Sequence, residues 1–404
     1  MAENKEKKVL NVPNLRFPGF EGEWEKKRLG DFTERVKRKN KYNLSKLPLT
    51  ISAKYGLVDQ ITFFNKIVAS TDMSNYYLLK KGEFAYNKSY SNDYPWGAIK
   101  RLDNYEQGVL SALYICFTTQ DNVESDFILQ YFESPKWHKS VSEIAVEGAR
   151  NHGLLNISVQ NFFQTYHYVP KEKKEQTKIA TLLHLIDERI ATQNKIIEDL
   201  KKLKCAIIDY TIETLQTDYI DFSEVYDMAG EGGTPSTSNM EYYENGCIPF
   251  VKIEDLKQKY LVSNKDHITE LGLQKSSAWL IPTNSILFSN GATIGEISIT
   301  TYPVCTKQGI LGIVPKVNFD TEYLYYLMSS RYFKREICRI ITEGTMKTAY
   351  LKDINKIRCP IPSKAIQQEI VSLPSVLDTK IEIEQRILEK FICQKQYLLR
   401  QMFI

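Results

Sequence analysis

Two stretches of the sequence decide the fold: KEKKEQTKIATLLHLIDERIATQNKIIEDLKKLKCAIIDYTI at 171–212 and KAIQQEIVSLPSVLDTKIEIEQRILEKFICQKQYLLRQMF at 364–403. When they are shifted by 191 positions the stretches align, and Asp187 falls on Asp378. Apolar residues recur in both about every 3.5 positions, which is the spacing of a coiled-coil seam that must pack on another helix. The sequence therefore predicts two long, related helices that pair with each other.

Polar residues interrupt the apolar seam at matched places in the two stretches. Gln193 matches Glu384, and Lys204 matches Lys395. These residues are either tolerated at the edge of the seam or fix the register between the helices. If the helices pair antiparallel about a midpoint between the breaks, Lys204 is expected to meet Glu384. Pro374 is expected to kink the second helix or to delay its regular part. The residues expected at the pairing surface are Ile186, Ile190, Gln193, Ile197, Lys204, Leu377, Ile381, Glu384, Leu388 and Lys395.

The regions that precede the two helices share a fainter pattern. EQGVL at 106–110 parallels KQGIL at 307–311, and the pair EG occurs at both 147–148 and 343–344. Short alternating or β-branched runs bounded by turn residues predict strands, and they lie at 49–51, 112–117, 297–300 and 310–314. The sequence therefore predicts an α+β fold. Two similar β-rich domains are separated by two long antiparallel coiled-coil helices and related by a pseudo-two-fold axis.

The repeat also predicts a division of the chain. The expected segments are an N-terminal arm (1–20), a first β-rich domain (21–168), a central spacer helix (169–215), a second β-rich domain (216–360) and a C-terminal spacer helix (361–404). A spacer helix of this length spans roughly 60 Å at 1.5 Å per residue. DNA half-sites one helical turn apart, about 34–36 Å, are read by modules with two-fold symmetry. The spacer is therefore long enough to act as a ruler on duplex DNA.

Composition restricts the class of protein. A chain of 404 residues with 43% hydrophobic and 25% charged residues is expected to form two or more globular domains. No apolar run approaches a membrane span, and the N-terminus lacks the apolar segment of a secretory signal. The seven cysteines are scattered without a C-x-x-C pair, so reduced thiols in the cytoplasm are expected. Residues 1–100 hold 19 Lys or Arg against 11 Asp or Glu, which suits a polyanionic partner and equally an ordinary mixed surface.

Several catalytic motifs are missing from the sequence. There is no Pro-Pro pair of the kind that amino-methyltransferases use to hold a flipped base, no G-x-x-x-x-G-K-[ST] phosphate loop and no H-E-x-x-H metal motif. The glycine-rich GEGG at 230–233 predicts a plain loop, because no buried strand and apolar helix flank it as in a cofactor-binding turn. No catalytic residue, metal ligand or cofactor site is expected on this chain.

Four stretches carry a specific resemblance. They are PNLRFPGF at 13–20 with Trp24, GTPS at 233–236 followed by IPFV at 248–251, SNGATIG at 289–295, and the proline-led helix that contains Gln176 and Asp187. In these stretches the chain resembles the specificity (S) subunits of type I restriction–modification systems, in the family's order and over nearly its entire length. Tyr242-Tyr243 departs from the tryptophan that the family often has there. The first domain has KSY at 88–90 where the family usually has a glycine-rich sequence. The DNA target of this domain is therefore harder to infer by analogy.

The resemblance implies a non-catalytic DNA-binding subunit in a bacterial cytoplasm. Each β-rich domain would be a target recognition domain that reads one half of a bipartite, asymmetric site on double-stranded DNA, and the helices would set the spacer. Two modification subunits, which carry S-adenosylmethionine and the adenine methyl-transfer chemistry, would dock on the helical region. Restriction subunits that use ATP and magnesium could join that complex.

Residues for DNA contact are chosen by their chemistry, since phosphates need cationic or donor groups and bases need paired donors and acceptors. The phosphate candidates are Lys37, Arg38, Lys39 and Lys41, a run that could equally be an ordinary solvated loop. The base-reading candidates are Lys88, Ser89, Asn92, Arg150, Asn151 and His152 in the first domain and Ser289, Asn290, Lys307, Thr345, Met346 and Lys347 in the second. The alternative for about half of them is turn capping, because Ser and Asn often cap turns.

Two rival functions remain. A protein scaffold that presents two β-rich interaction modules on a helical spacer would explain the repeat and the missing catalytic motifs, but not the four family stretches. Salt-sensitive binding to duplex DNA would separate it from a DNA reader. A self-sufficient methyltransferase-nuclease is disfavoured, because the chain has neither a cofactor motif nor an adenine-pocket motif.

Overall fold

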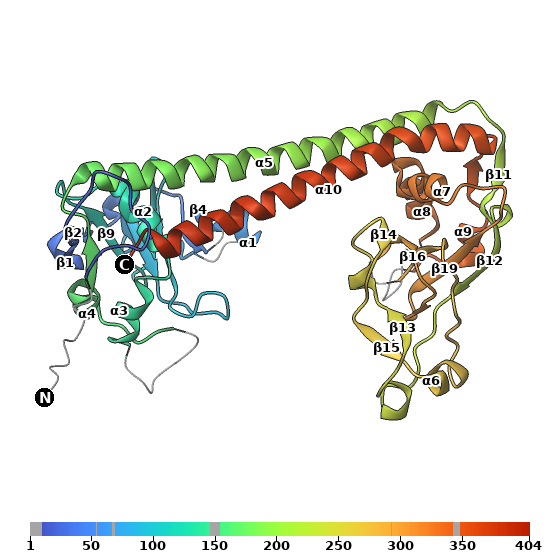
Figure 1. The fold of residues 1–404 in the computed structure, drawn as a ribbon, viewed down its shortest axis with the longest axis horizontal. Helices are drawn as coiled ribbons and strands as arrows, with labels where there is room; N and C mark the ends of the chain where they lie inside the picture. The colour runs from blue at the N-terminus through green and yellow to red at the C-terminus, as the bar shows by residue number, and fades with distance from the viewer. Residues whose placement is uncertain (1–9, 54, 67–68, 146–153, 292, 342–347) are drawn as a thin grey trace, which may run out of the picture. The chain divides into compact units, whose positions relative to one another are not determined.

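The computed structural model describes residues 10–53, 55–66, 69–145, 154–291, 293–341 and 348–404. The chain divides into two compact units, one of Met1–Asn194 with Ile387–Ile404 and one of Lys195–Arg386. Each unit contains one β-rich domain together with part of each long helix (Figure 1).

A four-stranded antiparallel sheet forms the centre of the first unit. Its strands, in spatial order, are β2 (Thr33–Arg35), β9 (Ile115–Thr119), β6 (Phe84–Asn87) and β7 (Ala98–Arg101). Three antiparallel pairs accompany it: β1 (Glu25–Arg28) with β10 (Tyr166–Val169), β3 (Leu49–Ser52) with β4 (Gly56–Asp59), and β5 (Tyr77–Lys80) with β8 (Gln107–Leu110). The helices are α1 (Gln60–Phe64), α2 (Ser125–Glu133), α3 (His138–Ser142) and α4 (Val159–Gln164).

The second unit contains a five-stranded and a three-stranded sheet. The larger is ordered β12 (Tyr226–Glu231), β19 (Ile310–Pro315), β16 (Ile286–Ser289), β17 (Ile297–Thr300) and β14 (Tyr260–Leu261); the smaller is β15 (Asp266–Ile268), β13 (Ile248–Val251) and β18 (Cys305–Thr306). Strand β11 (Tyr219–Asp221) pairs with β20 (Arg358–Pro360). The helices are α6 (Glu270–Gln274), α7 (Thr321–Ser329), α8 (Arg331–Ile340) and α9 (Leu351–Ile354). Short 3-10 turns occur at Leu29–Asp31, Lys41–Asn43, Phe222–Glu224, Met240–Tyr242 and Ile253–Asp255.

The predicted strands at 49–51, 297–300 and 310–314 are confirmed by β3, β17 and β19. The strand expected at 112–117 begins only at Ile115. Ser111 forms a turn before it, because its hydroxyl accepts a hydrogen bond from the Leu113 N–H (3.2 Å) and its carbonyl one from the Tyr114 N–H (3.3 Å). That turn uses the first residues of the predicted run.

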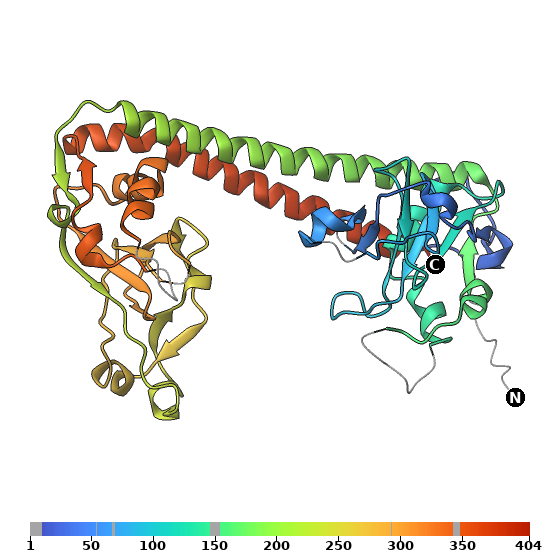
Figure 2. The ribbon, with the colours of Figure 1, turned by 180° about the vertical axis from the view of Figure 1, so that it is seen from behind.

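The two long helices are α5 (Lys173–Thr214) and α10 (Lys364–Gln401), which confirms the helices expected from the apolar period. In the first unit, the Lys395 ammonium lies 2.5 Å from Asp187. In the second unit, the Lys204 ammonium lies 2.5 Å from Asp378. The early part of α5 thus pairs with the late part of α10, and the late part of α5 with the early part of α10. The helices therefore run in opposite directions, side by side in both units (Figure 2).

One expectation about the pairing of these helices is wrong. Lys204 does not meet Glu384, which instead forms an ion pair with Lys380 at 2.5 Å. Asp378, the partner of Lys204, precedes Glu384 by six residues, or about 9 Å along a helix at 1.5 Å per residue. Pro374 does not delay the regular part of α10, since the helix continues through it from Lys364 to Gln401. The alternative, a kink at Pro374, stays a prediction.

Glutamines at matched positions join each long helix to its β-rich domain. Gln176 donates from Nε2 to the carbonyl of the proline that leads the helix (2.9 Å), and its Oε1 accepts from the Glu124 N–H at the start of α2 (2.8 Å). Gln367 makes the same two bonds, the second with the Asp320 N–H at the start of α7 (both 2.8 Å). The repeat seen in the sequence is therefore also a repeat of contacts.

A buried histidine is expected to make the first unit sensitive to acid. The ring of His167 lies 2.8 Å from the Tyr131 hydroxyl at Nδ1 and 2.8 Å from the Thr165 hydroxyl at Nε2. Burial lowers the pKa of His167 to about 3. The unfolded chain binds this proton near pH 6.5, so the unfolded state holds more protons between that pH and the folded pKa. The free energy of unfolding is expected to fall by up to about 1.4 kcal/mol per pH unit below pH 6.

Urea denaturation between pH 7 and pH 4.5 measures this slope. The His167→Gln variant is the control, because glutamine keeps polar groups in place but does not titrate, and its slope is expected to be smaller. An equal slope in both proteins would assign the acid sensitivity to other groups, among them His138, whose pKa is also lowered by burial.

Candidate nucleic-acid interface

The basic run of the first unit follows β2 and ends at Lys41, the first residue of the next 3-10 turn. Lys37 and Lys41 are exposed. The Arg38 guanidinium donates to both carboxylate oxygens of Glu83 (2.8 and 3.1 Å), and the Lys39 ammonium donates to a backbone carbonyl (2.8 Å). Arg38 and Lys39 therefore hold the segment in place, while Lys37 and Lys41 offer charge at the surface.

Three of the first domain's base-reading candidates lie in the loop between β6 and β7. Ser89 and Asn92 are exposed, whereas Lys88 is half-buried and donates to the Ile157 carbonyl (3.3 Å). The other three candidates, Arg150, Asn151 and His152, lie outside the described residues. The structure therefore presents a polar surface loop at Ser89 and Asn92.

Two of the second domain's candidates are buried at the end of β16. Ser289 and Asn290 are 0% and 2% exposed. The Ser289 hydroxyl accepts from the Glu296 N–H (2.8 Å), and the Asn290 amide donates to the Ala349 carbonyl (3.2 Å). Both side chains stabilise the loop from inside, so neither can touch a base unless the loop rearranges. Three further candidates of this domain lie outside the described residues, namely Thr345, Met346 and Lys347.

Lys307 is exposed on the tight turn between β18 and β19, which we call the 307–309 turn. The backbone N–H groups of its three residues are bonded to β13 and to the stretch 231–234. Their partners are the Val251 carbonyl (2.9 Å), the Thr234 hydroxyl (3.3 Å) and a Glu231 carboxylate oxygen (2.9 Å). Gly309 has φ +91°, which favours glycine. Three backbone hydrogen bonds hold the turn, and its polar side chains Lys307 and Gln308 are exposed.

The sequence predicted a plain loop at the glycine-rich stretch 230–233. The structure differs, because this stretch begins within a strand and supports the 307–309 turn. Gly230 and Glu231 are the last residues of β12, which pairs with β19. The strand places the Glu231 carboxylate beneath the turn, and the Gly232 N–H donates to the Ile310 carbonyl (2.8 Å).

A cavity of about 500 Å³ adjoins the 307–309 turn, and we call it the second-domain cavity. Besides the turn, its lining includes Glu254, Gly291, Thr348 and Tyr350. The sequence had indicated only Lys307 among the residues that line it. The neighbouring Gln308 could have been found from the repeated EQGVL and KQGIL, whereas Glu254 carried no signal in a search for donors.

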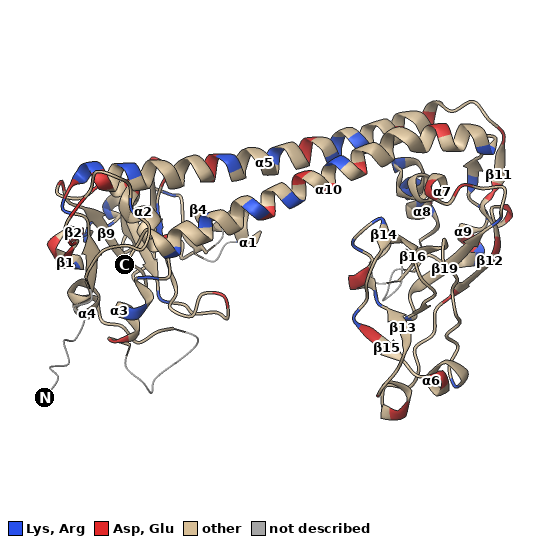
Figure 3. Ribbon diagram, in the orientation of Figure 1, with Lys and Arg blue, Asp and Glu red and all other residues tan. Residues whose placement is uncertain are grey.

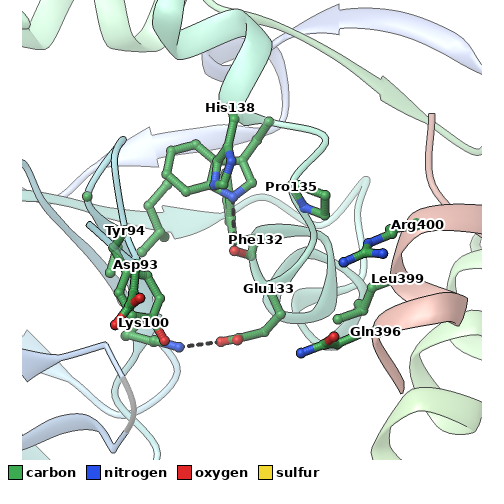
Figure 4. Close-up of a pocket in the computed structure, with 14 residues that line it drawn as sticks. Asp93, Tyr94, Lys100, Phe132, Glu133, Pro135, His138, Gln396, Leu399 and Arg400 are labelled. Atoms are coloured by element: carbon green, nitrogen blue, oxygen red, sulfur yellow. Dashed lines mark hydrogen bonds and ion pairs between the residues drawn. The ribbon is translucent and has the colours of Figure 1, made fainter. Parts of the chain in front are cut away.

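A smaller cavity of about 230 Å³ lies in the first unit, between its domain helices and the last turns of α10 (Figure 4). The Lys100–Glu133 ion pair (2.6 Å) lies on one side, and Leu399 and Arg400 lie on the other. None of the DNA-contact candidates within the described residues lines it. We therefore assign this cavity to the junction of domain and helix, not to the nucleic-acid interface.

The residues expected at the helix pairing surface are buried or half-buried. Ile186, Gln193, Ile197, Leu377, Ile381 and Glu384 are buried, and Ile190, Lys204, Leu388 and Lys395 are half-buried. The remaining surface of α5 and α10 carries charges of both signs (Figure 3). The burial pattern is that of an apolar seam with a solvated outer face.

An aspartate in each unit connects the helix pair to the β-rich domain. Besides its ion pair with the lysine of the other helix, Asp187 accepts from the Gln130 amide in α2 (3.0 Å). Asp378 accepts in the same way from the Tyr326 hydroxyl in α7 (2.5 Å). We call these two sites the aspartate junctions. They occupy matched positions of the repeat and give each unit the same attachment.

The described residues contain no group of three or more His, Cys, Asp or Glu that could hold a metal ion. All seven cysteines lie within those residues and have free thiols. None of the helices in the described ranges has the length and apolar character needed to cross a membrane.

Residues 219–391 match the family model of the type I restriction modification DNA specificity domain. The matched stretch begins with β11 and ends in the second half of α10. It therefore includes the second domain, with the 307–309 turn and the second-domain cavity.

Two curated proteins are similar to parts of the chain. The type I restriction enzyme MjaIX specificity subunit of Methanocaldococcus jannaschii is 32% identical over 173 residues, which are 41% of this chain and 40% of that protein. The EcoR124I/EcoR124II specificity subunit of Escherichia coli is 30% identical over 154 residues, which are 37% of this chain and 38% of that protein. The chain thus matches about two fifths of the length of these relatives.

Solved structures share the fold over almost the entire chain. The type I restriction-modification system S subunit from M. genitalium gives a TM-score of 0.54 at 17% identity, covering 97% of this chain and 99% of that one. A chain from a study of complex assembly and conformational transition of the type I R-M system gives 0.61, with the same identity and coverage. The expected α+β architecture, with two β-rich domains joined by two long helices that pack together, is therefore confirmed.

Proposed function

We propose that the chain is a DNA specificity subunit of a type I restriction–modification system, which selects the DNA target of that system and is itself not catalytic. The match of residues 219–391 to the DNA specificity domain carries this proposal. The matched glutamines and aspartate junctions support a second reader, because the first unit attaches its β-rich domain to the helices by the same contacts.

Each β-rich domain reads one half of a bipartite, asymmetric site in double-stranded DNA. The proposed contacts to phosphate come from the exposed Lys37 and Lys41, on a segment that Arg38 and Lys39 stabilise. The proposed base contacts come from the loop of Ser89 and Asn92 in the first domain and from the 307–309 turn in the second. The segments that contain Arg150, Asn151 and His152, and Thr345, Met346 and Lys347, remain candidates for base contact.

The long helices set the distance between the half-sites and hold the partner subunits. They contain 42 and 38 residues, or roughly 60 Å at 1.5 Å per residue. Two modification subunits dock on them and supply S-adenosylmethionine and the methyl-transfer chemistry, and restriction subunits can add ATP- and magnesium-dependent cleavage. Two equivalent surfaces suit two copies of one partner. Such a complex acts on cellular DNA in the cytoplasm. We propose that the five segments defined from the sequence are the functional parts of the chain.

Single-molecule sequencing of methyladenine tests this function directly. DNA is taken from cells that express the chain with its modification subunit, and the control cells express the modification subunit alone. We expect one bipartite, asymmetric motif with a fixed spacer only when both proteins are present. Unmethylated DNA, or methylation without a motif, would contradict the proposal. A lack of salt-sensitive binding to duplex DNA would favour the protein scaffold.

A further inference from the structure

Two carboxylates line the second-domain cavity, and they differ in what they bind. Glu231 accepts the Gly309 N–H (2.9 Å), so one of its oxygens is already used. Glu254 is exposed, and within the described residues its carboxylate has neither an ion pair nor a hydrogen bond. An ionised carboxylate can only accept hydrogen bonds. Glu254 therefore brings an unused acceptor to this cavity.

The backbone at Glu254 is fixed although its side chain is exposed. It lies on the 3-10 turn Ile253–Asp255, where the Lys252 N–H donates to the Asp255 carboxylate (2.9 Å). The preceding Val251 carbonyl accepts the Lys307 N–H (2.9 Å). The backbone at Glu254 and the 307–309 turn are therefore held by hydrogen bonds of the same segment. Only the side chain of Glu254 can rotate. Because the backbone is already fixed, the entropy lost when Glu254 binds is limited to that of its side chain.

The charge of Glu254 decides which part of DNA it can face. A carboxylate beside phosphate is repelled, so the residue is unfavourable in a backbone contact. Base edges differ, because the major groove displays hydrogen-bond donors at cytosine N4 and adenine N6. The exposed Lys307 and Gln308 nearby can contact phosphate or a neighbouring acceptor.

We propose that Glu254 is a specificity-determining residue that selects a base with an exocyclic amino group, adenine or cytosine, at one position of one half-site. The inference rests on the proposed function of the second domain. It assigns a role in sequence discrimination to an acidic residue in a site otherwise described by its donors.

Reversal of the hydrogen-bonding character gives the sharpest test. Glu254→Lys replaces an acceptor with donors, and lysine is suited to the N7 and O6 acceptors of guanine. The methylation motif of the complete complex is determined for wild type and variant. We expect adenine or cytosine at one position in the wild-type motif, a change to guanine or a tenfold or greater loss at that position in the variant, and an unchanged second half-site. Glu244→Lys is the matched control, an exposed carboxylate of the same unit outside the cavity.

A second variant separates base reading from charge repulsion. Glu254→Gln removes the charge but keeps an acceptor, and it is expected to relax discrimination at the same position. A uniform rise in affinity for all DNA sequences would place Glu254 near phosphate and overturn the proposal, as would a Glu254→Lys complex with the wild-type motif. If the wild-type complex methylates no motif, the proposed function itself fails, which is a different result from an unchanged motif in the variants.

Discussion

Replacing Lys259 with methionine is expected to lower the free energy of unfolding of the second unit by about 3–5 kcal/mol. The Lys259 side chain is only 8% exposed, and its ammonium lies 2.5 Å from Glu322 and 3.7 Å from Asp378. It also donates to the hydroxyls of Tyr326 (2.8 Å) and Ser375 (3.0 Å). Methionine keeps most of the volume but leaves the partly buried Glu322 without its cation, while Asp378 keeps its ion pair with Lys204. This cluster includes the aspartate junction of the second unit, so its loss weakens the attachment of the domain to the helix pair.

The loss is expected to depend on pH. Burial raises the pKa of Glu322, but hydrogen bonds from Lys259, Ser375 and Tyr260 outweigh it, and the pKa lies below its usual value. A carboxyl group with a depressed folded pKa contributes stability that is present above its unfolded pKa and is lost as pH falls through its folded pKa. The difference between wild type and Lys259→Met should therefore shrink as pH is lowered from 6 to 3.5.

Urea denaturation of the full chain, with hydrogen exchange of peptides from α7 and α10, measures both effects. The control is Lys356→Met, since Lys356 pairs with Asp353 but its side chain is 76% exposed. Exposed ion pairs contribute little, so this variant is expected to change stability by less than about 1 kcal/mol. Equal losses in the two variants would show that the buried cluster has no special role.

The long helices could be predicted because their signal is local and repeated. The apolar period continues over many helical turns, and a similar sequence recurs 191 residues later. The register of the pair could not be predicted in the same way. Lys204 and Glu384 lie on the seam, but Lys204 bonds to Asp378, which the apolar period does not include. Register depends on which charged residues pair across the seam. The apolar period does not show which residues of the two helices lie opposite each other.

The candidate site was less predictable because polarity does not reveal exposure. The Ser289-Asn290 pair looks like a surface loop in the sequence, but it ends a central strand of the larger sheet and is buried. Lys307 was predicted from its chemistry, because phosphates and bases are contacted by cationic and donor groups. Glu254 was missed, since a search guided by phosphate charge selects cations and amides. Only the fold brings it to the same cavity as Lys307.

A methyl group at Gly232 is expected to reduce methylation of the motif by about 10- to 100-fold, since overpacking by one carbon costs about 1–3 kcal/mol. The added Cβ of alanine would lie 2.2 Å from the Thr306 hydroxyl, 2.3 Å from the Thr306 carbonyl oxygen and 2.7 Å from that of Lys307. Two of these atoms are backbone, so rotation of a side chain cannot relieve the clash. The chain that must move leads directly into the 307–309 turn, which presents Lys307 and Gln308.

The matched control for Gly232→Ala is Gly230→Ala, two residues earlier, within β12. The nearest atom to a Cβ at Gly230 is the Trp279 Nε1 at 3.4 Å, an ordinary contact, so this variant is expected to methylate like wild type. Copurification with the modification subunit shows whether each variant still assembles, because the aspartate junctions are untouched by either change. A Gly232→Ala complex that assembles but loses its motif would locate the defect in DNA reading. Normal methylation by that complex would mean that the 307–309 turn can shift without effect, and it would remove this turn from the interface.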